Sequence, residues 1–196
     1  MQRYLKLPVH LSARCALELS GLAHFVPLGK KQSLQLSTHN TVKVVIPNWF
    51  TEHFKDQMTL TLIQRNLFQD DALIGITKKR IEGIECDIST PERAILEVLD
   101  LVPQNMQYEH AYYLMEGLQT LRPTLVQDLL IKCSSIKVKR LFLHLAEKCN
   151  MPWLKRINTN KIVLGQGVRS ITKGGCLDPK YQISVPKISE DSDYDE

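Results

Sequence analysis

The order of hydrophobic and polar positions in the first half of the chain predicts one helix followed by several short strands. Residues 12–25 place Ala16, Leu19 and Ala23 on one helical face, behind Ser12, a residue type that caps helix N-termini. The alternation typical of strands then follows in five segments: residues 33–37, 41–46, 57–64, 72–77 and 81–88.

Three shorter features interrupt these strands. His39-Asn40 predicts a turn, and Trp49, Phe50 and Phe54 predict one apolar face of a short helix after Pro47. The basic run from Lys78 to Arg80 is expected at or near a turn or a strand end.

From residue 89 onward the pattern becomes helical. Pro91 fits the first turn of a helix that Ser89 or Thr90 begins. The apolar stripe of this helix consists of Ile95, Leu96, Leu99 and Val102. Three further helices are expected over residues 108–121, 123–133 and 138–149.

The last part of the chain returns to short alternating runs, over residues 161–164, 168–173 and 181–185, separated by glycines. Gly165-Gln166-Gly167 is typical of a hairpin turn. We therefore expect an α+β fold with short strands, a central block of helices and a C-terminal strand hairpin. Residues 1–187 should form one domain, and residues 188–196 an acidic disordered tail.

Charge is distributed unevenly along the chain. Residues 1–131 carry 13 Lys and Arg against 14 Asp and Glu, whereas residues 132–187 carry 12 against two. Residues 188–196 carry five acids and no base. Such segregation creates a local positive field that an anionic partner can use, although a solvated basic face is the alternative interpretation.

The remaining composition points to a soluble, cytoplasmic protein. The five cysteines are odd in number and contain no CxxC pair, which disfavours a disulfide framework and predicts reduced thiols. The N-terminus has no apolar signal-peptide core, and no run approaches the roughly 18 apolar residues that suggest a membrane span.

The common enzymatic motifs are missing from the sequence. It contains no phosphate-binding GxxxxGK[ST] loop, no HExxH and no GxSxG, and its six histidines show no ligand spacing. Glu92, Glu97 and Asp100 are expected as solvated charges on an amphipathic helix, with Arg93 paired to Glu97 four residues on. We therefore expect no catalytic residue, no metal and no cofactor.

The basic segment is the best candidate for a working surface. Phosphate groups are bound mostly by Lys and Arg, and aromatic residues lie among the cations here. The predicted residues for nucleic-acid or partner binding are Lys137, Lys139, Arg140, Lys155, Arg156, Arg169 and Lys173.

Three stretches of the sequence resemble the C-terminal region of AbiEi-family antitoxins of type IV toxin–antitoxin systems, which are linked to abortive infection. They are DISTPERAILEVLDLVP, CSSIKVKRLFLHLAEK and KGGCLDPKYQISVPK, and the resemblance runs from about residue 4 to residue 187. In that family an N-terminal winged helix-turn-helix binds operator DNA. Met1 falls just ahead of the similar region, so we expect that domain to be lacking here.

The resemblance implies a regulatory protein that antagonises an AbiEii-type nucleotidyltransferase toxin, with or without a stable complex, and that takes part in transcriptional autoregulation. The alternative is a nucleic-acid-binding protein that uses the basic region of residues 132–187. A third reading, an enzyme with carboxylates scattered in sequence, is disfavoured because the C-terminal part has so few acids.

Overall fold

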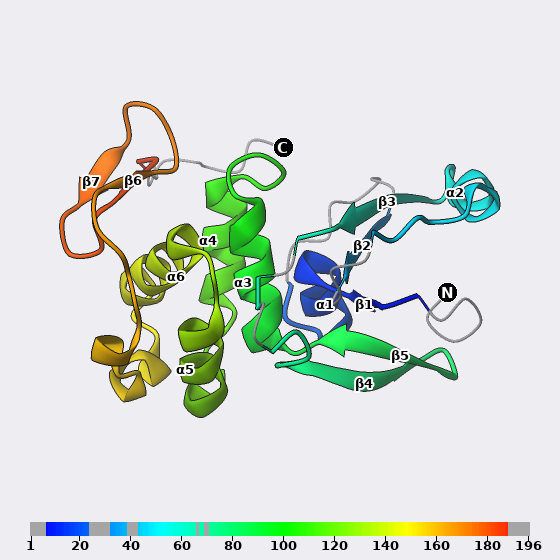
Figure 1. Cartoon of the computed structure of the whole chain (residues 1–196), viewed down its shortest axis with the longest axis horizontal. Coiled ribbons are helices and arrows are strands. Elements are labelled where there is room, and N and C mark those ends of the chain that lie inside the picture. Colours follow the sequence, from blue (N-terminus) through cyan, green and yellow to red (C-terminus); the bar gives the residue numbers. More distant parts are fainter. Residues whose placement is uncertain (1–6, 24–31, 39–42, 66, 69–70, 188–196) are drawn as a thin grey trace, which may run out of the picture.

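The computed structural model describes residues 7–23, 32–38, 43–65, 67–68 and 71–187. A mixed five-stranded sheet forms one side of the molecule and a block of helices forms its centre (Figure 1). A small three-stranded sheet lies on the opposite side. Strands and helices are grouped rather than alternating, which confirms the predicted α+β class.

The large sheet and its two short helices come from the first half of the chain. In order these are β1 (Val9–Leu11), α1 (Ala13–Leu19), β2 (Gln32–Thr38), α2 (Asn48–Phe54), β3 (Met58–Ile63), β4 (Ile76–Ile81) and β5 (Ile84–Ser89). The strand order is β3-β2-β1-β5-β4. Strand β1 is central, antiparallel to β2 and parallel to β5, and this pairing sets Leu11 opposite Leu36 and Ile88.

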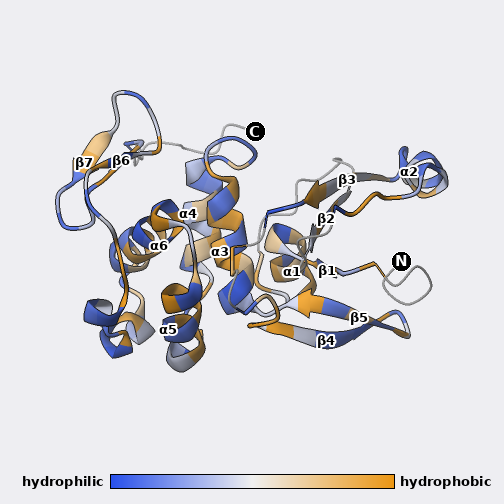
Figure 2. Ribbon diagram, in the orientation of Figure 1, coloured by the Kyte–Doolittle hydropathy of each residue, from blue (hydrophilic) through white to orange (hydrophobic). Residues whose placement is uncertain are grey.

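The helical block contains α3 (Pro91–Leu101), α4 (Tyr108–Glu116), α5 (Pro123–Lys132) and α6 (Ile136–Lys148). Helix α3 packs against α1 on its sheet side and against the other three helices on its far side. Its residues from Glu92 to Leu99 are all buried, so α3 is the shared core of both parts. Helices α5 and α6 mix hydrophobic and hydrophilic positions along their length, as amphipathic helices do (Figure 2).

The C-terminal part begins with two 3-10 helices, η1 (Pro152–Arg156) and η2 (Thr159–Lys161). The strands β6 (Arg169–Ser170), β7 (Cys176–Asp178) and β8 (Ile183–Val185) follow. Strands β7 and β8 are antiparallel, which confirms the predicted hairpin, and β6 joins them parallel to β8. The buried side chains of Ile183 and Val185 anchor this sheet, and β8 packs on α6.

Several predicted boundaries in the first half are wrong. Residues 43–46 form no strand, whereas 39–42, with the predicted turn, lie outside the described residues. The first helix ends at Leu19, and the strand expected from residue 72 begins only at Ile76. Gly75, in the left-handed region at φ +69°, makes the turn before it. The basic run from Lys78 to Arg80 lies in β4 and stops one residue before its end, near the turn at Glu82 and Gly83, as predicted.

Two further expectations concern side chains and the chain end. Of the apolar face predicted for α2, Trp49 is 63% exposed and Phe50 is half-buried. The acidic tail, residues 188–196, lies outside the described residues.

Candidate functional site

The basic start of α6 faces the interior instead of solvent. Lys137 is half-buried, and its ammonium donates to the carbonyls of Asp100 and Val102 at 2.8 and 2.6 Å. It thus satisfies carbonyl groups that the C-terminal end of α3 leaves unpaired. Burial is the main reason that the pKa of Lys137 lies below its ordinary value.

Arg140 holds the C-terminal segment to α6. Its side chain is 1% exposed and donates to four backbone carbonyls, of which the Gln182 carbonyl lies 2.8 Å away. The other three belong to Leu164, Gly165 and Gly167, at 2.8, 3.1 and 2.5 Å. These bonds replace the water that a buried guanidinium has lost.

Lys139 lies beside it and is also buried, with its ammonium 3.3 Å from the carbonyl of Val163. The structure therefore places Lys139 and Arg140 in the interior and not on the predicted binding surface. It also corrects two sequence predictions nearby, because residues 161–164 form no strand and Gly165-Gln166-Gly167 is not a hairpin turn. The carbonyls of this segment bond to side chains of α6, so they are not available to a neighbouring strand.

The other four predicted residues are exposed. Lys155 and Arg156 end η1, Arg169 begins β6, and Lys173 follows it. None of the four side chains forms an ion pair or a hydrogen bond with any part of the chain that the structure describes. The pair in η1 and the pair near β6 belong to elements at two separate places on the same side of the molecule (Figure 1).

The two acids of this region are already paired with side chains of the same region. Residues 132–187 contain only Glu147 and Asp178. Glu147 accepts from the ammonium of Lys180 at 2.6 Å, and Asp178 accepts from Nδ1 of His144 at 2.6 Å. Within the described ranges, the exposed cations of η1 and β6 therefore keep their charge uncompensated at short range.

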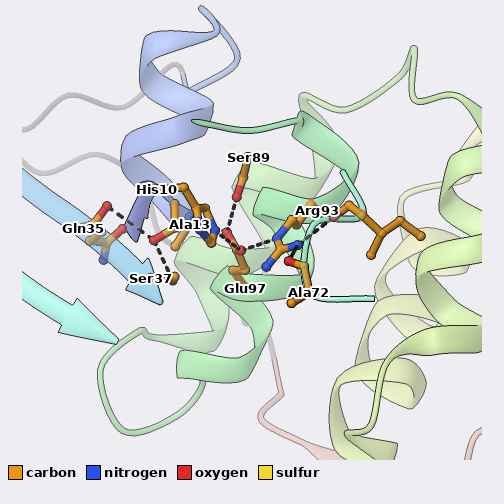
Figure 3. Close-up of polar contacts among 10 residues, drawn as sticks. His10, Ala13, Gln35, Ser37, Ala72, Ser89, Arg93 and Glu97 are labelled. Carbon is orange, nitrogen blue, oxygen red and sulfur yellow. Dashed lines mark hydrogen bonds and ion pairs between the residues drawn. The ribbon is translucent and has the colours of Figure 1, made fainter. Parts of the chain in front are cut away.

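A second constellation is buried between the sheet and α3 (Figure 3), and its long-range contacts leave no pattern in the sequence. Glu97 lies at its centre with both carboxylate oxygens occupied. Its Oε1 lies 3.0 Å from Nε2 of His10 and accepts from Nε of Arg93 at 2.8 Å. Its Oε2 accepts from the backbone N–H of Ala13 at 3.0 Å and from the hydroxyl of Ser89 at 2.8 Å.

The Ala13 bond shows how α1 begins. Ser12 precedes the helix as predicted, but its side chain makes no capping bond. Its hydroxyl instead donates to the carbonyl of Gln35 and accepts from the hydroxyl of Ser37, within the sheet. A carboxylate from a distant helix therefore satisfies the first N–H of α1, and a negative charge at that end is also favoured by the helix dipole.

Arg93 extends the network to the segment before β4. Its Nη1 donates to the carbonyls of Ala72 and Ile74 at 2.8 and 2.7 Å, and its guanidinium lies 4.7 Å from the ring centre of Phe68. Burial alone raises the pKa of the Glu97 carboxyl, but the charges and hydrogen bonds of His10 and then Arg93 outweigh it and lower that pKa to about 2.

This arrangement suits a structural role better than a catalytic one. Glu97 is ionised and fully bonded, and the adjoining cavity, of about 10 Å³, has room for no more than a water molecule. The sequence spacing correctly predicted the pairing of Arg93 with Glu97, but the expectation that Glu92 and Glu97 are solvated was wrong. His10 carried no sequence signal, since its partner lies 87 positions away.

A third group links α4, α6 and β7 in a row. His144 bonds Asp178 through Nδ1, and its Nε2 lies 3.1 Å from the hydroxyl of Tyr108. Such a row resembles a proton relay, but Tyr108 is 2% exposed and burial raises the pKa of its hydroxyl. The hydroxyl is therefore a poor nucleophile, and the row ties the C-terminal sheet to the helices.

No three His, Cys, Asp or Glu side chains in the described ranges gather in a way that could hold a metal ion. Among the same residues, no helix combines the length and hydrophobicity that crossing a membrane requires.

Comparison with known proteins gives one family and one fold. The model of the family described as "Transcriptional regulator, AbiEi antitoxin, Type IV TA system" matches residues 31–186. No curated protein matches the chain. The solved structure of the RV2827C protein from Mycobacterium tuberculosis has a similar fold, with a TM-score of 0.57 and 11% sequence identity. That match covers 92% of this chain and 63% of the mycobacterial chain.

Proposed function

The chain belongs to the AbiEi antitoxin family of transcriptional regulators in type IV toxin–antitoxin systems, and on this premise we propose that it antagonises an AbiEii-type nucleotidyltransferase toxin in the cytoplasm. It does so without enzymatic activity of its own. We assign this antagonism to four exposed cations, which we call the basic surface: Lys155, Arg156, Arg169 and Lys173.

One observation supports this assignment above the others. The basic surface is exposed, and the two acids in its part of the sequence already have partners in His144 and Lys180. Cations without nearby carboxylates attract phosphate groups. Because the basic surface consists of two separated pairs, an elongated anion such as a nucleic-acid strand fits it better than a compact anion. Binding the nucleic acid on which the toxin acts would protect it without a stable complex of the two proteins.

Co-expression with the toxin tests this proposal in a growth assay. The native chain should restore growth, and the variant Lys155→Glu/Arg156→Glu/Arg169→Glu/Lys173→Glu should not. Lys43→Glu/Lys55→Glu, a charge reversal at exposed lysines outside the basic region, is the matched control and should rescue like the native chain. Rescue by the fourfold variant at native abundance would remove the basic surface from the proposal. Failure of the native chain against a toxin of confirmed toxicity would refute the antitoxin role.

A second candidate function is DNA binding with autoregulation of transcription, as the family description suggests. The same surface supports it, because phosphate contacts supply most of the affinity for DNA. A reporter fused to the chain's own promoter would distinguish the two functions. Repression by the native chain supports autoregulation, whereas unchanged reporter output, together with rescue from the toxin, supports antagonism alone.

A further inference from the structure

A pocket of about 330 Å³ opens on the opposite side of α3 from the basic surface, between α1, β2 and the segment that joins α3 to α4. Its size falls in the range of small-molecule sites. It is lined by Arg14, Ser33, Gln35, the five residues from Pro103 to Gln107, and His110. The described residues that line it include no carboxylate, and Glu18, the nearest acid in sequence to Arg14, bonds the Nε of that arginine at 2.6 Å.

Hydrogen-bond donors converge on this pocket from α1 and β2. Arg14 contributes a guanidinium, which binds phosphate well because its donors are planar and forked. Gln35 is only 7% exposed, and its side-chain oxygen accepts from the backbone N–H of Cys15. The amide nitrogen of Gln35 has no partner in the described parts of the chain. This amide group can therefore donate to a bound acceptor.

The start of α4 also adjoins the pocket, with Glu109 as the acidic residue of its first turn. Gln107 precedes this nine-residue helix, and its side chain makes no capping bond. The first N–H groups of the helix therefore have no side-chain acceptor at Gln107, and they lie beside the pocket that Gln107 and His110 line. Helix N-termini of this kind bind anions.

The rim of the pocket carries a different chemistry. Gln104, Asn105 and Gln107 are exposed and present carboxamides, each with a donor next to an acceptor. This paired pattern matches the edges of nucleobases. Pro103 and Met106 add apolar surface against which a flat ring can pack.

We propose that this pocket binds a nucleotide. The phosphate lies against Arg14, Gln35 and the start of α4, and the base lies against the carboxamide rim. The nucleotide has two sources with the same chemistry, a free mononucleotide or the phosphorylated end of a nucleic-acid strand. The inference does not rest on the proposed function, because none of these residues belongs to the basic surface.

Isothermal titration of the full chain tests the proposal with three probes: inorganic phosphate, adenosine monophosphate and a 5′-phosphorylated oligonucleotide. Arg14→Gln should weaken binding of the nucleotide probes about tenfold, as expected for the loss of a charge-assisted bond. Gln104→Ala should weaken the nucleotide probes severalfold while leaving phosphate binding unchanged. Lys55→Gln and Gln64→Ala, exposed and away from the pocket, are the matched controls and should change nothing.

The source of the nucleotide follows from the probe that binds. Binding of the mononucleotide assigns the free molecule, and binding of the oligonucleotide alone assigns a strand end. Nucleotides that bind no more tightly than phosphate, or with an affinity that neither variant changes, would overturn the proposal. Gln104 is exposed, so its variant stays informative if Arg14→Gln reduces the thermal stability of the fold.

Discussion

Nε2 of His10 lies 3.0 Å from Oε1 of Glu97, so a residue of β1 and a residue of α3 share one buried bond across 87 sequence positions. The same carboxylate also satisfies the first N–H of α1 and the hydroxyl of Ser89. Glu97 therefore connects the central strand, the strand beside it and two helices.

Replacing Glu97 by Gln should lower the free energy of unfolding by about 3–5 kcal/mol, because it leaves the buried Arg93 without its counter-charge. The carboxamide also presents an N–H₂ group to a donor whose hydrogen bond the carboxylate accepts, so that bond is lost. Urea unfolding measures the change, with the exposed Glu82→Gln as a matched control near zero. A loss below about 1 kcal/mol would mean that water replaces the missing acceptor.

The stability should also depend on pH through Glu97. Its pKa in the folded protein is about 2 against an ordinary value of 4.5, so the folded state favours the ionised form. The stabilisation is complete above the ordinary value and is lost as pH falls toward 2. Between pH 6 and pH 3 this carboxyl should account for a loss of about 2 kcal/mol. Glu97→Gln should remove that part of the slope, and identical slopes in both proteins would contradict the assignment.

Replacing Arg140 by Ala should loosen the C-terminal segment more than the rest of the fold. Its four carbonyl partners would lose a charged donor, at a cost of about 3 kcal/mol. Arg140→Lys should restore only part of the lost stability, because an ammonium group cannot reach all four carbonyls together. Amide hydrogen exchange should rise in residues 163–185 and change little in α3, while the exposed Lys161→Ala should behave like the native protein. Unchanged exchange in that segment would show that Arg140 is not its anchor.

If the basic surface binds duplex DNA, log affinity should fall linearly with log salt, by about 0.9 for each phosphate neutralised. Arg169→Glu/Lys173→Glu should reduce that slope by about two. Lys43→Glu/Lys55→Glu is the matched charge reversal and should leave the slope unchanged. Fluorescence anisotropy between low and moderate salt gives both slopes, and affinity that does not depend on salt would rule out phosphate contacts as its source.

The sequence predicted the elements whose pattern is local. The apolar stripe of α3 and the proline at its first turn are enough to place it, and the same holds for α5. What failed depends on distant partners. Residues 161–164 alternate like a strand, yet their carbonyls bond to Lys139 and Arg140, which no local pattern reveals.

The predicted site residues likewise fall into two groups, one exposed and one buried. A run of cations in sequence indicates the sign of the charge but not the direction in which each side chain points. A helix turns neighbouring side chains to different sides. Lys155, Arg156, Arg169 and Lys173 face solvent, whereas Lys139 and Arg140 face backbone carbonyls. Glu97 looked like a surface charge because its partner His10 belongs to another element.

The central position of β1 also determines when the large sheet can form during synthesis. Among the strands of the large sheet this one is synthesised first, but its neighbour β5 ends at Ser89 and its bonded carboxylate is at Glu97. The large sheet therefore cannot close until about 80 further residues have been made after β1. At roughly 5–20 residues per second, the nascent β1 waits several seconds with its pairing edge toward β5 open. During that interval the chain is most exposed to wrong strand pairing, and chaperones have their greatest effect on its yield.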